Sequence, residues 1–236
     1  MGWTLSMITF WLASTWTACQ GPKPLPPEEG IHLVVLGSST AAGQGPDRRD
    51  QGWAIRYEQY LKESFPNARL TNLAESGYLS YQLLPTGFIP PWGRPQPDPK
   101  RNITKALSLR PQGIIINLPS NDTHAGYGFE EQWVNLLRLV EIAQGQGVKV
   151  WVCTTQPRIL PPEKVKLQER LRDKTLIELK DYAIDFWTGI GDCAGWPLEE
   201  FNSGDGTHLN AAGHAVLLER VIERNIPAGI GARVLE

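Results

Sequence analysis

Two pairs of residues in this chain of 236 residues have the types and spacing for nucleophilic chemistry. Ser38 and Ser39 follow a glycine, and Asp205 stands three residues before His208. A serine hydroxyl is a poor nucleophile until an imidazole takes its proton, and a carboxylate can hold that imidazole in the required tautomer. Taken singly, each residue has a plainer role, because serines cap helices and Asp-Gly forms ordinary turns. The elements that position these residues must therefore decide between the two interpretations.

Apolar runs predict five strands that alternate with helices. The expected strands cover residues 31–36, 69–74, 113–118, 148–154 and 183–186. Helical spacing or capping residues predict helices before Pro66, over 79–84, from Asn102 to Leu109, around 133–142, and over 162–182 and 211–226. This alternation predicts an α/β fold, a flavodoxin-like parallel five-stranded sheet between helices in three α/β/α layers. Six prolines between Pro85 and Pro99 predict a long surface loop.

Four polar segments lie where the carboxyl edge of that sheet is expected. Residues 37–40, 75–78 and 119–122 follow the first three strands, and residues 205–208 precede the last helix. Active groups of such folds gather at this edge. The sequence thus predicts one site built from segments that are far apart along the chain.

In this order, the four segments resemble the blocks of the SGNH family, also called GDSL hydrolases, which is named for a Ser, a Gly, an Asn and a His. The resemblance runs from about Ile31 to about Ile226. It implies the SGNH hydrolase fold and a serine esterase that hydrolyses a carboxylic ester through an acyl-enzyme. It also implies a small-molecule ester substrate, no cofactor and no metal.

The resemblance assigns a role to each matching residue. Ser39 matches the nucleophile, and Asp205 and His208 match the pair that activates it. The oxyanion hole would consist of the backbone N–H groups of Ser39 and Gly77 and the side-chain amide of Asn121. Such donors must already be aimed at the oxygen that becomes negative in the tetrahedral intermediate.

Two positions depart from the family pattern. Ser38 stands where the family usually has Asp, and Pro119 stands where the third block usually has Gly. Neither change removes a catalytic group. We expect the Ser38 side chain to point away from the cleft, since Ser39 takes the nucleophile position.

The substrate is less constrained by the sequence. Specificity in this family lies in loops, here residues 85–99 and 188–203, where Trp92 and Trp196 are candidates to line a cleft. No long apolar stretch in these loops suggests a tunnel for a lipid tail, so we expect a short acyl chain. Acetylated sugars and lysophospholipid-like esters are the substrate types that the family offers.

Two other functions use the same sequence features. A flavodoxin-like protein would cradle a phosphate or a nucleotide with residues 37–45 at a helix N-terminus. A non-catalytic surface lipoprotein would use the cleft to bind glycan or lipid. The first leaves Asp205 and His208 without a purpose, and the second predicts that a probe for active-site serines fails to label the protein.

Charge and composition limit the partners. The 23 Lys and Arg residues nearly balance the 25 Asp and Glu residues, giving a net charge of −2 and a pI of about 6.1. This balance argues against a nucleic-acid-binding surface and against a polybasic membrane patch. The three cysteines show no paired spacing typical of a zinc site.

The first residues predict export. Residues 1–18 carry no charged side chain and have the length of a signal peptide, and Ala18-Cys19 resembles the end of a bacterial lipoprotein signal. Cys19 would then carry the lipid, residues 19–30 would be a Pro-rich tether, residues 31–230 the hydrolase domain, and residues 231–236 a tail. The protein would be secreted or lipid-anchored in the cell envelope, where an oxidising compartment would permit a disulfide between Cys153 and Cys193.

Overall fold

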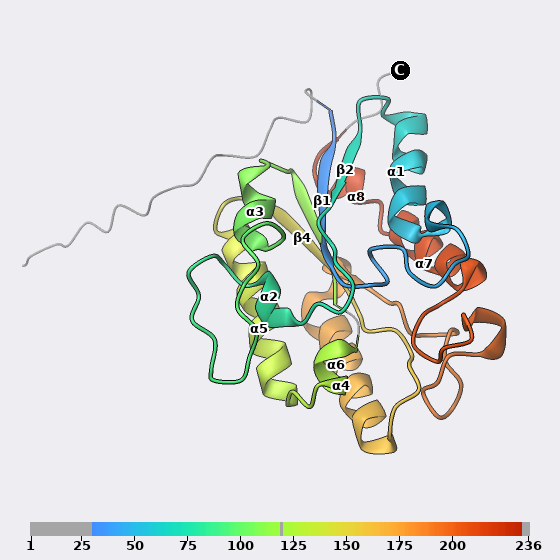
Figure 1. Ribbon diagram of the computed structural model, residues 1–236. Coiled ribbons are helices and arrows are strands. Elements are labelled where there is room, and N and C mark those ends of the chain that lie inside the picture. The colour runs from blue at the N-terminus through green and yellow to red at the C-terminus, as the bar shows by residue number, and fades with distance from the viewer. Residues whose placement is uncertain (1–29, 119, 233–236) are drawn as a thin grey trace, which may run out of the picture.

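A parallel sheet of five strands forms the centre of the fold (Figure 1). The computed structural model describes residues 30–118 and 120–232. The strands are β1 (His32–Gly37), β2 (Arg69–Asn72), β3 (Gly113–Asn117), β4 (Lys149–Cys153) and β5 (Ala183–Ile184). They lie in the order β2-β1-β3-β4-β5, and every neighbouring pair is parallel. The predicted five-stranded parallel sheet is confirmed.

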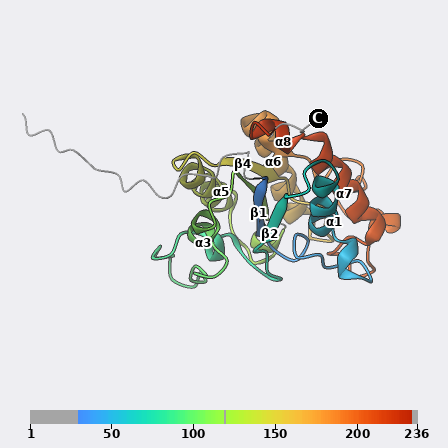
Figure 2. The same cartoon turned by 90° about the horizontal axis from the view of Figure 1, so that it is seen from above.

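Helices cover both faces of the sheet (Figure 2). On one face lie α1 (Trp53–Ser64), α7 (Ala211–Glu223) and the short α8 (Ile226–Gly229). On the other lie α2 (Ser80–Leu83), α3 (Ile103–Ser108) and α5 (Phe129–Gln144). The remaining helices are α4 (Asn121–His124) and α6 (Pro162–Leu179), and α6 contacts α4, α5 and β5. The predicted three-layer architecture is therefore confirmed.

The central strand β1 is apolar on both faces because both are covered. Leu33 and Val35 pack into the core beneath α1 and α7, whereas Val34 and Leu36 pack into the core beneath α3 and α5. All four side chains are fully buried. This explains the continuous apolar run in the sequence, which is typical of central parallel strands. The carboxyl end of β1 is consequently a fixed point for the residues that follow it.

Some predicted helix ends are wrong. The helix expected over 211–226 ends at Glu223, because Asn225 adopts a left-handed conformation with φ of 44° and a new turn begins at Ile226. The charged helix expected to reach Tyr182 ends at Leu179, and a 3-10 turn covers the last residues. The short helix α4 was not predicted.

Residues 85–99 form a loop without a helix or strand, as the prolines predicted. Trp92 is fully exposed. Trp196 is 42% exposed and its Nε1 donates to the carbonyl oxygen of Leu160 at 3.4 Å. Cys153 is buried, Cys193 is exposed, and both are free, so the disulfide that an oxidising compartment would permit is not formed.

The predictions for the two ends of the chain stay predictions. The signal peptide, Cys19, the tether up to residue 29 and most of the tail lie outside the described residues. Within residues 30–118 and 120–232, no helix has the length and apolar character needed to cross a bilayer.

Candidate active site

Ser38 and Ser39 begin the turn that follows β1. A side chain at Gly37 would collide with the carbonyl oxygen of Asn117, so only glycine allows β1 to approach β3 this closely. The turn is closed by two backbone hydrogen bonds, from Ala42 to the Ser38 carbonyl and from Gln44 to the Ser39 carbonyl, each 2.9 Å long. Ser39 is thereby placed at the carboxyl edge of the sheet, only 6% exposed.

The segment after Ser39 packs directly on the segment that holds His208. A side chain at Gly45 would collide with the carbonyl oxygen of Leu209, and Gly45 has a φ of +114°. Gln156 bridges the same two segments, because its Nε2 donates to Thr40 Oγ1 at 2.7 Å and to the Thr207 carbonyl at 3.3 Å. The structure thus joins the first and the last of the four predicted segments.

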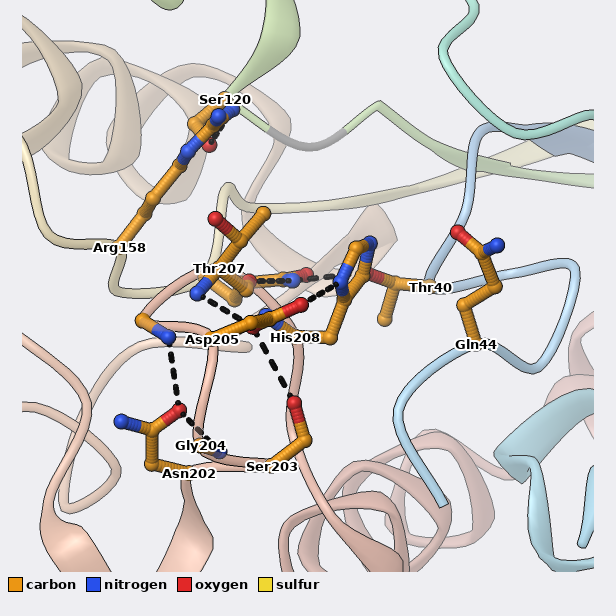
Figure 3. Close-up of polar contacts among 12 residues, drawn as sticks. Thr40, Gln44, Ser120, Arg158, Asn202, Ser203, Gly204, Asp205, Thr207 and His208 are labelled. Carbon is orange, nitrogen blue, oxygen red and sulfur yellow. Dashed lines mark hydrogen bonds and ion pairs between the residues drawn. The ribbon is translucent and has the colours of Figure 1, made fainter. Parts of the chain in front are cut away.

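The Asp205 carboxylate holds the His208 ring and its own turn. Its Oδ2 lies 2.6 Å from His208 Nδ1, and its Oδ1 accepts from the backbone N–H groups of Thr207 and His208, both at 2.8 Å (Figure 3). Burial alone would raise the pKa of Asp205, but these hydrogen bonds outweigh it and hold the pKa well below its usual value. The ionised carboxylate favours the tautomer with a proton on Nδ1, which leaves Nε2 of His208 able to act as a base.

Several backbone N–H groups at the site are without an acceptor in the described part of the chain. Those of Ser39 and Gly77, two of the predicted oxyanion donors, are among them. Gly77 has a φ of +80°, a conformation that side chains other than glycine rarely adopt. Free donors near a serine hydroxyl are what an oxyanion hole requires.

The third predicted donor, Asn121, is engaged within the protein. Its Nδ2 donates to Ser38 Oγ at 2.8 Å and to the Tyr78 carbonyl at 3.1 Å, and its Oδ1 accepts from Arg158 at 3.3 Å. Ser38 is fully buried and does not open to the cleft, but the sequence did not predict its contact with Asn121. Its hydroxyl is buried and faces Asn121, because a short side chain at position 38 can reach the amide across the gap between β1 and β3.

Beneath Asn121, the next residue ties two segments of the site together. Asp122 is buried and accepts from the backbone N–H of Ser80 at 3.1 Å and from its hydroxyl at 2.6 Å, while Asn135 donates to the same hydroxyl at 2.9 Å. Burial raises the pKa of Asp122 to about 6, against the opposing effect of the Ser80 hydrogen bonds. This contact anchors α4, which carries Asn121, to α2, which follows the Gly77 turn.

One contact of a serine–histidine pair, the hydrogen bond between the two side chains, is not formed in the described residues. No hydrogen bond joins Ser39 Oγ to the His208 imidazole in the residues that the structure describes, although the surrounding segments are in contact. Catalytic hydrogen bonds are often long in proteins without substrate and tighten when the substrate binds. Across residues 30–118 and 120–232, no cluster of three or more His, Cys, Asp or Glu residues is placed to hold a metal ion.

A family model decides the relationship. The model of the GDSL-like lipase/acylhydrolase family matches residues 35–216, which include the predicted catalytic and oxyanion-hole residues but not Cys19. The chain belongs to this family. The resemblance of the four segments is confirmed, and with it the assignment to enzymes that hydrolyse carboxylic esters.

Solved structures share the fold of this family member. A protein from Desulfitobacterium hafniense described as lipolytic and of the G-D-S-L family has a TM-score of 0.64 and 16% identity, over 82% of this chain and 99% of that one. The psychrotrophic esterase EstA from Pseudoalteromonas sp. has a TM-score of 0.58 and 16% identity, over 85% and 98% of the two chains. A family two carbohydrate esterase from Clostridium thermocellum, solved with cellohexaose, has a TM-score of 0.53 and 17% identity, over 89% and 66%. A search of curated protein sequences finds no significant match.

Sequence reasoning missed the residues that follow β4. Gln156 joins two of the family segments, and Arg158 contacts Asn121. The signal was available, since Thr155, Gln156 and Arg158 directly follow a predicted strand, at the same edge as the other segments. Asn202 was missed as well, although its Oδ1 accepts from the backbone N–H groups of Gly204 and Gly206 and so shapes the turn that carries Asp205 (Figure 3).

Proposed function

We propose that the protein hydrolyses a short-chain carboxylic ester through an acyl-enzyme on Ser39. His208 Nε2 takes the proton of the Ser39 hydroxyl as Oγ attacks the ester carbonyl, and Asp205 stabilises the resulting imidazolium. When the tetrahedral intermediate collapses, the C–O bond to the alcohol breaks and His208 returns the proton to the leaving oxygen. A water molecule then attacks the acyl-enzyme in the same way, releasing the acid and restoring Ser39.

One observation carries this proposal above the others. The Ser39 turn and the Asp205–His208 turn are in contact, and the backbone N–H groups of Ser39 and Gly77 lack acceptors within the described chain. A phosphate-binding protein would use such donors but would have no use for the Asp205–His208 pair. Hydrolysis uses both.

The Asn121 amide already donates both of its hydrogens within the protein, so it can serve the oxyanion only if one of these hydrogen bonds is replaced. Both hydrogens of its Nδ2 are taken, one by Ser38 Oγ and one by the Tyr78 carbonyl. We propose that the oxyanion replaces Ser38 as an acceptor, since a negative oxygen is a stronger acceptor than a neutral hydroxyl. Breaking the bond to Ser38 costs about 1 kcal/mol, the typical net value of a neutral hydrogen bond, and the charge-assisted bond to the oxyanion more than offsets it.

The surroundings support a polar alcohol and a short acyl group. A cleft of about 610 Å³ lies beside the Ser39 and Gly77 turns and is lined mostly by polar side chains, among them Asp47, Arg49, Glu75 and Arg101. The cavity lined by Ser120 and Asp122 has only about 50 Å³, too little for a long acyl chain. An acylated sugar or a similar hydrated alcohol fits the larger cleft.

Labelling and kinetics test the proposal together. A fluorophosphonate probe should label the wild type, and Ser39→Ala should abolish both labelling and the hydrolysis of p-nitrophenyl esters. Ser38→Ala is the matched control and should keep most of the activity, with acetate and butyrate esters preferred over long chains. Undiminished labelling of Ser39→Ala would overturn the nucleophile assignment. If the probe does not label the wild type, the glycan- or lipid-binding alternative is favoured. If the purified protein is yellow or retains a nucleotide, the flavodoxin-like alternative is favoured.

We also propose that the protein is exported and that Cys19 is its lipid attachment site. The support is the uncharged stretch over residues 1–18 and the Ala18-Cys19 pair. In a bacterial host, the wild type should fractionate with membranes and incorporate labelled fatty acid, whereas Cys19→Ser should do neither. If the mature protein carries no lipid and begins at a residue other than Cys19, the lipid attachment is refuted and simple secretion remains.

A further inference from the structure

Arg158 lies between two of the family segments without belonging to either. It follows β4, and its Nη1 donates to Asn121 Oδ1 at 3.3 Å and lies 3.5 Å from Ser120 Oγ. The next residue, Ile159, donates its backbone N–H to the Gly206 carbonyl at 2.8 Å. Figure 3 shows the Arg158 side chain extended from its loop toward Ser120. The guanidinium is thus held beside Asn121 and close to the turn of Asp205.

The charge of Arg158 is only partly compensated. No carboxylate of the described residues lies within 4.0 Å of its guanidinium, whereas Arg94 and Arg101 each form an ion pair at 2.7 Å. Its Nε and Nη2 have no acceptor within the described chain. Arg158 is half-buried, and this burial lowers its pKa, against a weaker opposite effect from Asp205. The open donors of a half-buried guanidinium need partners, and an anion would satisfy them better than water does.

Two further basic groups surround Arg158. Lys164, in the first turn of α6, donates from Nζ to the backbone carbonyl of His124 at 2.8 Å. The positive charge of Arg158, together with burial and the charge of Lys164, lowers the pKa of His124. Of the nearby acids, Asp205 compensates the charge of Arg158 only in part and from beyond ion-pair distance, and Asp122 is buried and bound to Ser80.

We propose that Arg158 binds an anionic group, a carboxylate or a phosphate, which the ester substrate carries near its scissile bond. The proposal rests on the proposed function and names a substrate class for the same site. The planar guanidinium would offer Nε and Nη2 as a fork to two oxygens of the anion while Nη1 keeps its bond to Asn121. Lys164 adds attraction at longer range. The bound anion would hold the ester carbonyl next to the three oxyanion donors.

Matched substrates test the proposal. The neutral references are phenyl acetate and 4-acetoxybenzamide. Phenyl hemisuccinate carries a carboxylate on the acyl side, 4-acetoxybenzoate carries one on the alcohol side, and 4-acetoxyphenyl phosphate carries a phosphate there. The wild type should prefer at least one anionic ester. Arg158→Gln should lower kcat/KM for that ester by about 10- to 100-fold, the usual effect of losing a charge-assisted pair, and for the neutral esters by less than about threefold.

Control variants separate this role from others. Arg170→Gln removes an exposed arginine of α6 that pairs with Glu130 and should leave all rates unchanged. Lys164→Gln should give a smaller loss than Arg158→Gln, and added salt should weaken the anion preference. Equal losses for neutral and anionic esters in Arg158→Gln would mean that the arginine only positions Asn121, and would overturn the proposal. If Arg158→Gln had the same kcat/KM as the wild type for the anionic esters, the proposal would be overturned too.

A binding measurement makes failure of the two proposals distinguishable. Benzoate and phenyl phosphate are titrated into Ser39→Ala protein, which cannot turn over substrate, and into the Ser39→Ala/Arg158→Gln double variant. Binding of either anion that weakens about 10-fold or more in the double variant supports the anion site even if no test ester is hydrolysed. Hydrolysis of the neutral esters without any Arg158-dependent binding would reject the anion site and leave the esterase intact.

Discussion

Asp122 and Asp205 both support the candidate site, but from opposite environments. Asp122 is buried between α4 and α2, and its pKa is raised to about 6. The side chain of Asp205 is half exposed, accepts hydrogen bonds from the 203–208 turn, and has a lowered pKa. The comparison shows that the surroundings of an aspartate decide which role it has in the site. Burial suits a carboxylate that holds a scaffold together, whereas a charge-stabilising turn suits one that must stay ionised beside a histidine.

The largest expected effect is that of Asp205→Asn on turnover. The amide can still accept from the turn, but it no longer stabilises the imidazolium or enforces the tautomer, so kcat should fall by about 10³- to 10⁴-fold. Because the side chain is half exposed, solvent screens much of its contribution to stability, and the melting temperature should fall by only about a few degrees. Steady-state kinetics and thermal unfolding measure the two quantities. Asp122→Asn is the matched control, and an equal loss of kcat in both variants would erase the distinction between the two carboxylates.

The next effect concerns the residue that links the two regions. Asn121→Ala should reduce kcat by about 10²- to 10³-fold, or about 3–4 kcal/mol of transition-state stabilisation, with little change in KM. Ser38→Ala removes a partner of the same amide and should change kcat by less than about threefold. If Asn121→Ala unfolds more readily but keeps a normal kcat per folded molecule, Asn121 only forms the turn and is not a catalytic residue.

The fold was more predictable than the site, and the reasons are physical. Central strands such as β1 are buried on both faces, so their apolar runs stand out in the sequence, and Gly37 before Ser39 marks the turn. The orientation of Ser38 depends on the distance between β1 and β3, and the role of Arg158 depends on a loop that folds back over Asn121. Such contacts between distant segments leave no periodic pattern in the sequence.

A third effect appears in the pH dependence of stability. Because the pKa of Asp122 is raised from 3.8 to about 6, the folded protein binds this proton more tightly than the unfolded chain. Its stabilising contribution is therefore present below about pH 4 and is lost as the pH rises toward 6. Relative to Asp122→Asn, the wild type should lose about 3 kcal/mol of unfolding free energy between pH 3.5 and 7. Urea unfolding at several pH values measures this difference. If the unfolding free energies of the two proteins changed in parallel with pH, the raised pKa of the buried Asp122 carboxyl would be contradicted.

The smallest expected effect is the absence of such a trend at Asp205. Its folded pKa lies below that of the unfolded chain, so its stabilising contribution is complete above the unfolded value and is lost only as the pH falls through the folded one. Between about pH 5 and 7 the carboxylate is ionised in both states. In proteins that also carry His208→Gln, so that no imidazole titrates beside position 205, the difference in unfolding free energy between Asp205 and Asp205→Asn should thus be constant over this window, while that for Asp122→Asn still changes. A slope for Asp205→Asn as steep as that for Asp122→Asn would mean that the hydrogen bonds of the 203–208 turn do not keep Asp205 charged. His208 would then lack the anion that its role as a base requires.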